Sequence, residues 1–136
     1  MASDEQFVEL VRDAPRAVLG TIDAEGRSHL VPIVFAVLAD GRIVTAVDDK
    51  PKTTRDLKRL RNIARDPRVT VLVDEYDEDW SRLWWVRVSG EATVTEDSPA
   101  GALDALVGKY DAYRDAPPAG PWITIRTIEI VVWSAR

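Results

Sequence analysis

The sequence predicts a mainly β fold: an antiparallel sheet closed into a small barrel, with about three helices outside it. Three observations lead to this class. Six segments carry the short alternating or apolar runs that are typical of strands. Several of them are joined by short turns, such as Asp40-Gly41, which favours neighbouring antiparallel strands. The chain has 136 residues, 46% of them hydrophobic, which suits a single domain over residues 1–136.

The first third of the chain predicts one helix and three strands. Ser3 and Gln6 form a possible capping box for a helix that ends near Pro15. Strands are expected at residues 17–22, 28–38 and 42–47. Pro32 lacks a backbone N–H, so its strand should lie at a sheet edge or contain a bulge.

The remainder predicts two more helices and three strands. One helix should begin at Thr53 or Thr54 and end at Asp66-Pro67, with one apolar face made by Leu57, Leu60, Ile63 and Ala64. Ser98-Pro99 should open the other, which runs to about residue 107 and is extended by residues 110–114. Strands are expected at 69–73, 83–95 and 122–133. The longest should alternate, with Trp84, Val86, Val88, Ala92 and Val94 on the face opposite Trp85 and Arg87.

Composition excludes several classes of function. A net charge of −5 argues against general binding to nucleic acid. The chain has no cysteine and a single histidine, His29, so no metal site is expected. No apolar run is long enough for a membrane span, and the first residues lack a signal-peptide pattern. We therefore expect a cytoplasmic protein with no membrane or nucleic-acid partner.

Positive charge is concentrated in one segment of this acidic chain. Residues 50–68 hold eight basic residues and two carboxylates, a net charge of about +6, while the remainder holds 10 basic against 21 acidic residues. The segment follows a strand and enters a helix, whose free N–H groups favour an anion. Lys50, Lys52, Arg55 and Arg59 could then close on a phosphate. The alternative is a solvated basic face that only keeps the helix soluble.

Three runs, in the same order along the chain, resemble the split-β-barrel flavin and deazaflavin oxidoreductases related to pyridoxamine phosphate oxidase. The first comprises AVLGTI at 17–22 and GRSHLVPIVF at 26–35. The second comprises IVTAV at 43–47, the basic helix and NIARDPRV at 62–69. The third, YDEDWSRLWWVRVSG at 76–90, is similar to a subgroup that uses the deazaflavin coenzyme F420.

The resemblance implies a six-stranded split β-barrel that forms a homodimer, with two cofactor sites at the subunit interface. It places the backbone of Pro32, Ile33, Val34 and Phe35 beside the cofactor ring, and Thr45, Ala46 and Val47 at the ring and its ribityl chain. Arg59, eight residues before the proline of Asp66-Pro67, would bind the phosphate. Lys50 and Lys52, Thr53 and Arg55, and Asn62 complete the predicted site. Trp85 would contact the ring.

No catalytic side chain can be named, since the cofactor would supply the chemistry. The chain lacks the Arg-x-His pattern near its C-terminus that the oxidase making pyridoxal phosphate uses, so another small organic substrate is expected. Coenzyme F420 is the predicted cofactor, with FMN as the alternative. Two further alternatives remain open: a carrier or sensor that binds the cofactor without turnover, and a plain interaction domain with a solvated basic helix.

Overall fold

The computed structural model describes residues 9–47 and 57–135. Residues 9–12 are helical, as the sequence predicts for the helix before Pro15. The sheet strands are β1 (Ala17–Ile22), β2 (Ser28–Ile33), β3 (Ala36–Val37), β4 (Ile43–Ala46), β5 (Arg68–Glu75), β6 (Trp84–Thr95) and β7 (Trp122–Ser134). The helices are α2 (Lys58–Arg65), the short 3₁₀ helix η1 (Trp80–Arg82), α3 (Ala102–Lys109) and α4 (Asp111–Asp115).

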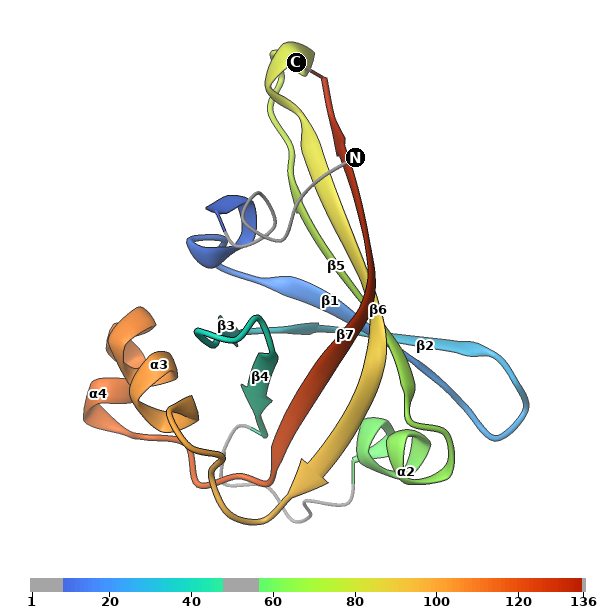
Figure 1. Cartoon of the computed structure of the whole chain (residues 1–136), viewed down its shortest axis with the longest axis vertical. Helices are drawn as coiled ribbons and strands as arrows, with labels where there is room; N and C mark the ends of the chain where they lie inside the picture. The colour runs from blue at the N-terminus through green and yellow to red at the C-terminus, as the bar shows by residue number, and fades with distance from the viewer. Residues whose placement is uncertain (1–8, 48–56, 136) are drawn as a thin grey trace.

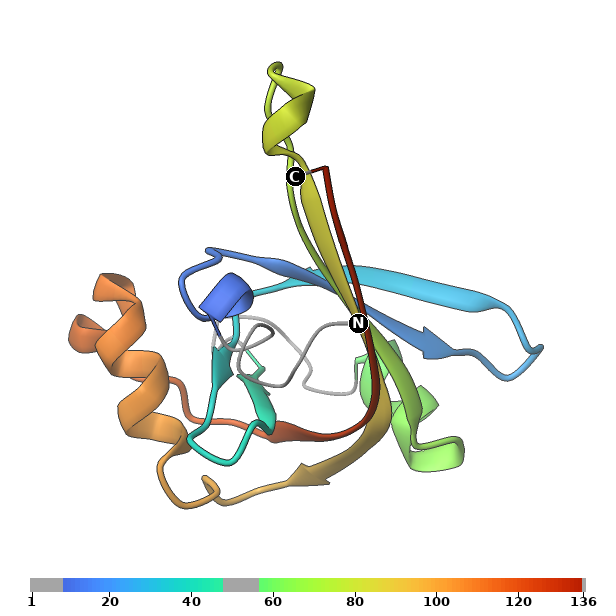
Figure 2. The same cartoon turned by 45° about the horizontal axis from the view of Figure 1, so that its top comes forward.

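The strands form one antiparallel sheet in the order β2-β1-β5-β6-β7-β4-β3. Its two edges, β2 and β3, follow each other along the chain with only Val34 and Phe35 between them. The sheet must therefore curl until its edges meet at this two-residue link, and Figures 1 and 2 show the resulting half-barrel. The predicted mainly β antiparallel class is confirmed. The sheet is curled rather than closed by a ladder between its edges.

The prediction of six strands is wrong, because the described residues form seven. The strand expected at 28–38 is interrupted at Val34 and Phe35, where backbone groups bind side chains of other elements instead of a neighbouring strand. Pro32 does lie on an edge strand, β2, where its missing N–H costs no ladder bond.

The alternation predicted for the longest strand is confirmed. In β6, Val86, Val88 and Ala92 are buried, while Arg87 and Thr93 are exposed. A bulge interrupts its pairing with β7 after Ser89. At that point a Cβ on Gly90 would lie 2.3 Å from the carbonyl oxygen of Arg126, so the close approach of the two backbones requires glycine.

Two predicted helix starts and one predicted face differ from the structure. Helix α2 begins at Lys58, after Leu57 in an extended conformation, whereas Thr53 and Thr54 lie outside the described residues. Helix α3 begins after Gly101, which has a φ of 83°, so Ser98 is not its cap. Ala64 is exposed, and Asn62 takes its place on the buried face of α2.

The buried side chains form two clusters. The larger fills the inside of the curled sheet and includes Leu19, Phe35, Val71, Val88 and Ile125. The smaller includes Leu38, Val44, Ala102, Leu106 and Trp122, and joins α3 to the outside of the sheet near β3 and β4. Figure 1 shows α3 and α4 on this side and α2 on the other. The rest of the outer sheet surface has no helix over it in the described part of the chain.

Among the residues that the structure describes, no helix combines the length and the apolar character needed to cross a membrane.

Candidate cofactor site

The two segments predicted to line a cofactor ring lie against each other. The hydroxyl of Thr45, on β4, donates a hydrogen bond of 2.7 Å to the carbonyl oxygen of Val34. Ala46 and Val47 continue along the strand, and the backbone N–H of Val47 binds the carbonyl oxygen of Pro121. The fold therefore brings segments 32–35 and 45–47 together.

Most side chains of these segments are buried in the core. Ile33, Phe35 and Thr45 are buried, as are Ala46 and Val47. Pro32 is exposed and Val34 is half-buried. A ring placed here would thus meet mainly backbone, together with Pro32 and Val34.

Arg59 occupies an unusual position on α2. It lies one turn before Asn62 and Ile63, the two buried residues of the helix, and so shares their inward-facing side. It is half-buried, and burial lowers the pKa of its guanidinium. Within residues 9–47 and 57–135, its side chain has no ion pair or hydrogen bond. A half-buried cation without a counter-charge is unfavourable unless an anion binds there.

The start of α2 offers further donors. Leu57, at the N-cap, provides no side-chain hydrogen bond, and the first turn has no acidic residue. The first N–H groups of the helix therefore have no capping side chain in the described part of the chain. Uncapped N–H groups beside Arg59 fit the phosphate of a flavin-type cofactor. Figure 1 shows the end of β4 and the start of α2 at the same end of the barrel.

The other predicted residue on α2, Asn62, has protein partners. Its side-chain amide nitrogen donates to the hydroxyl of Thr21 at 3.0 Å, and its carbonyl oxygen accepts from Arg65 at 3.1 Å. Arg65 also donates to the carbonyl oxygen of Ile22. Asn62 thus fastens α2 to β1. A contact with a cofactor stays a prediction.

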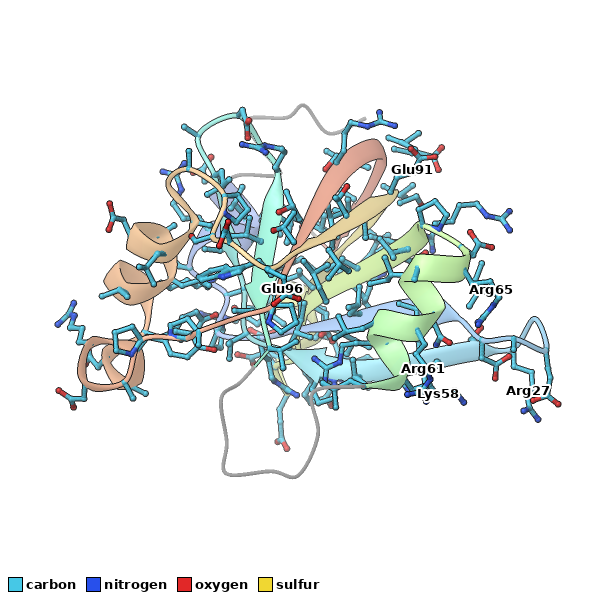
Figure 3. All side chains as sticks on the ribbon, turned by 90° about the horizontal axis from the view of Figure 1, so that it is seen from below. Arg27, Lys58, Arg61, Arg65, Glu91 and Glu96 are labelled. Atoms are coloured by element: carbon cyan, nitrogen blue, oxygen red, sulfur yellow. The ribbon has the colours of Figure 1, made fainter. Side chains whose placement is uncertain are left out.

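Other basic side chains surround α2, and Figure 3 shows Lys58, Arg61 and Arg65 on the helix with Arg27 on the adjacent β1–β2 turn. Part of this charge is neutralised by Asp23, whose carboxylate lies 3.3 Å from Arg27 and 3.6 Å from Lys58. The backbone N–H of Arg27 contributes most to lowering the pKa of Asp23 to about 2. The surface around α2 is therefore less positive than the sequence alone indicates.

Four predicted site residues, Lys50, Lys52, Thr53 and Arg55, lie outside the described residues. Their role in binding a phosphate stays a prediction.

Trp85 is separated from the other predicted residues of the same chain, by strands β5 and β1 on one side and by the length of β6 on the other. It is paired with Trp133 near one end of β6. Thr45 is paired with Ile123 on β7, and Ile123 is paired with Val94 near the other end of β6. Nine residues of strand separate Trp85 from Val94, which corresponds to roughly 30 Å. Through β5 and β1, however, Arg87 lies in one cross-strand row with Leu72, Val18 and Pro32, which places Trp85 roughly 15 Å from the segment at 32–34. A contact between Trp85 and a ring stays a prediction.

Sequence reasoning missed two residues beside the link between β2 and β3. Lys109 donates a hydrogen bond of 2.9 Å to the carbonyl oxygen of Phe35. The hydroxyl of Tyr110 lies 3.1 Å from the backbone nitrogen of Phe35 and 3.0 Å from its oxygen. These partners are 74 and 75 residues apart in the sequence, and no local pattern joins them.

A curled antiparallel sheet in this strand order defines the chain as a split-barrel protein. The family model described as pyridoxamine 5'-phosphate oxidase matches residues 3–132. The chain therefore belongs to the pyridoxamine 5'-phosphate oxidase family, and the resemblance predicted from the sequence is confirmed.

Solved structures share the fold at low sequence identity. A conserved hypothetical protein from Mycobacterium tuberculosis has a TM-score of 0.81 at 22% identity, covering 100% of this chain and 87% of that one. An FAD binding protein from Mycobacterium smegmatis has a TM-score of 0.68 at 18% identity, covering 97% and 95%. The heme storage protein HutZ from Vibrio cholerae has a TM-score of 0.72 at 12% identity, covering 98% and 95%.

One curated relative matches only a short stretch. The chain is 45% identical over 38 residues to the 1,4-beta-D-glucan cellobiohydrolase CEL6C of Podospora anserina, which is 28% of this chain and 10% of that protein. The chain thus spans a tenth of that relative, and the match shows no shared family.

Proposed function

We propose that this protein is an oxidoreductase that binds coenzyme F420 at a dimer interface and transfers hydride to or from a small organic substrate. Membership of the family supports a flavin-type cofactor. The observation that carries the proposal is Arg59, half-buried and without a described anionic partner beside an uncapped helix start. When bound, the cofactor would supply the hydride chemistry, so the protein needs to bind, orient and exclude water.

In this proposal each part of the site has a separate task. Arg59 and the first N–H groups of α2 hold the phosphate. The backbone from Pro32 to Val34, together with the end of β4, lines one side of the ring. Trp85 of a second protomer covers the ring, because within one chain strands β5 and β1 separate it from the ring segment that follows β2. Lys50, Lys52, Thr53 and Arg55 add positive charge to the phosphate site.

The choice between deazaflavin and FMN depends on how far the positive charge on α2 extends beyond the phosphate site. The tail of F420 carries several carboxylates, whereas FMN ends at one phosphate. Arg61 and Arg65 on α2 extend the positive charge beyond what one phosphate needs, which favours F420. FMN is the second candidate, and the FAD binding protein of the same fold supports it. Titration with each purified cofactor, followed by its absorption, decides between them.

Arg59 provides the test of the phosphate site. Replacing Arg59 by Ala should weaken cofactor binding about tenfold to a hundredfold, the equivalent of about 1.5–3 kcal/mol for a charge-assisted hydrogen bond. Arg61→Ala is the matched control, because it removes the same charge from the exposed side of the same helix. Fluorescence titration of both variants at equal ionic strength measures the effect. Equal affinities of Arg59→Ala and the wild type would show that the phosphate binds elsewhere.

The remaining alternatives differ in whether the protein binds the cofactor and whether it turns over a substrate. A carrier or sensor would bind reduced cofactor tightly but show no turnover with ketones, enones or quinones. A plain interaction domain would bind neither cofactor better than about 1 mM, a binding free energy of about −4 kcal/mol.

A further inference from the structure

The link at Val34 and Phe35 is the point where the two edges of the sheet meet. Because neither residue belongs to a strand, their backbone groups need other partners. The carbonyl oxygen of Val34 accepts from Thr45, and that of Phe35 accepts from Lys109. Tyr110 accepts from the N–H of Phe35 and can donate to the carbonyl oxygen of Phe35 or Pro15. Side chains therefore replace the missing ladder.

Lys109 is held in an apolar setting. Its ammonium nitrogen lies 3.8 Å from the centre of the Phe35 ring and 5.3 Å from that of Tyr110, within the range of cation–π attraction. Burial lowers its pKa to about 8, while the carboxylate of Asp13 acts in the opposite direction. Burial raises the pKa of Tyr110, the other titratable group in contact with Lys109.

We propose that Lys109 and Tyr110 are positioning residues for the cofactor: by fixing the backbone at Phe35 they hold the neighbouring Pro32–Val34 segment where the ring is bound. This inference rests on the proposed function, which places the ring against that segment. A displacement of about 1 Å in a positioning segment is enough to weaken a site strongly. The two residues come from the end of α3 and the turn to α4, so those helices act on the site without touching the cofactor.

Three variants separate the contributions. Tyr110→Phe removes only the hydroxyl, and Lys109→Met removes the charge while keeping a long apolar side chain. Each should raise the dissociation constant for the bound cofactor about tenfold. Lys109→Arg keeps the charge and can still stack on the Phe35 ring, so it should lose less affinity than Lys109→Met. Arg114→Met, at an exposed position on α4, is the control for loss of a charge on this side of the molecule.

Affinity as a function of pH gives a readout that a purely structural role would not change. In the wild type, the dissociation constant should rise as the pH passes about 8, where Lys109 loses its proton. Lys109→Arg should show a flat profile over the same range, since arginine remains charged. A cofactor phosphate is fully ionised well below this pH, its second pKa being about 6.

Stability should move in the opposite direction. The pKa of Lys109 is lower in the folded chain than its ordinary value of 10.5, so between about pH 8 and 10.5 only the unfolded chain binds the proton. The contribution of Lys109 to the free energy of unfolding therefore increases over that range. It should be absent in Lys109→Met.

The outcomes distinguish this inference from the proposed function. If Arg59→Ala loses affinity while Tyr110→Phe and Lys109→Met bind normally and only melt at lower temperature, positioning by this pair is wrong and the cofactor site stands. A wild type that binds neither F420 nor FMN overturns both. Reduced affinity of both Tyr110→Phe and Lys109→Met, with a pH response that is lost in Lys109→Arg, supports positioning by Lys109 and Tyr110.

Discussion

At the scale of single residues, a polar side chain joins α2 to the sheet. Asn62 is buried, and its amide bridges the hydroxyl of Thr21, also buried, and the guanidinium of Arg65. A buried hydroxyl that loses its hydrogen-bond partner cannot bind water instead, so the folded state loses free energy of stabilisation. The position of α2, and with it that of Arg59, depends on this contact.

Asn62→Ala should reduce the free energy of unfolding by about 1–3 kcal/mol, because it leaves the hydroxyl of Thr21 unpaired. Chemical denaturation measures the loss. Thr21→Val serves as the matched partner in a double-mutant cycle, since it removes the hydroxyl and keeps the shape. If the two losses simply add, the hydrogen bond is not what stabilises this junction.

At the scale of elements, the long β6–β7 pair depends on one bulge. Between Ser89 and Gly90 the pairing shifts by one residue, and Ile128 is the extra residue of β7. Past the bulge, both strands keep their apolar residues, such as Ala92 and Ile125, in the core. With this bulge, β6 and β7 each form part of the barrel and continue into the projecting end seen in Figure 1.

Gly90→Ala should destabilise the protein by about 1–3 kcal/mol, since the new methyl group would meet the backbone of Arg126. Gly108→Ala is the matched control. It makes the same change within α3, where nothing lies within 4 Å of the new Cβ, and it should stabilise the helix by about 0.5–1 kcal/mol. Thermal and urea unfolding of the two variants test the contrast. Equal effects would mean that the bulge tolerates a side chain.

At the scale of the whole molecule, several exposed apolar side chains lie on the outward face of the sheet, which has no helix over it in the described part of the chain. The register places Leu30 beside Gly20, Leu72 opposite Arg87, and Trp85 opposite Trp133, all on this one face. Leu30 is 65% exposed, Trp133 43% and Leu72 38%. Exposed apolar side chains that gather on one face are typical of an interface. They support the proposed homodimer, in which Trp85 reaches the site of the second protomer.

Leu72→Arg should weaken that dimer at least tenfold and lower cofactor affinity with it, because it places a charge in the centre of the face. Leu103→Arg is the matched control: Leu103 is 37% exposed, but lies on α3. Sedimentation and native mass spectrometry report the stoichiometry of protein and cofactor together. A wild type that is monomeric with cofactor bound would contradict the two-protomer site.

The signals that predicted the fold come from residues that are close together in the sequence. Alternation predicted the faces of β6, because burial on one face imposes a period of two. Pro32 predicted an edge strand or a bulge, because it has no N–H to donate to a neighbouring strand. Apolar spacing predicted α2 but assigned Ala64 to its buried face. The sequence alone could not show that Asn62 would be buried instead, because its partner, Thr21, is 41 residues away.

By itself the sequence determined the mainly β class, the family, the concentration of charge before and within α2, and Arg59 as the phosphate ligand to test. Only the tertiary structure decided that Arg59 faces inward without a described counter-ion, that strands β5 and β1 separate Trp85 from the ring segment at 32–34, and that Lys109 and Tyr110 hold the Phe35 backbone. The physical reason is that these properties depend on contacts between distant segments, which exist only once the sheet has curled and its two edges have met.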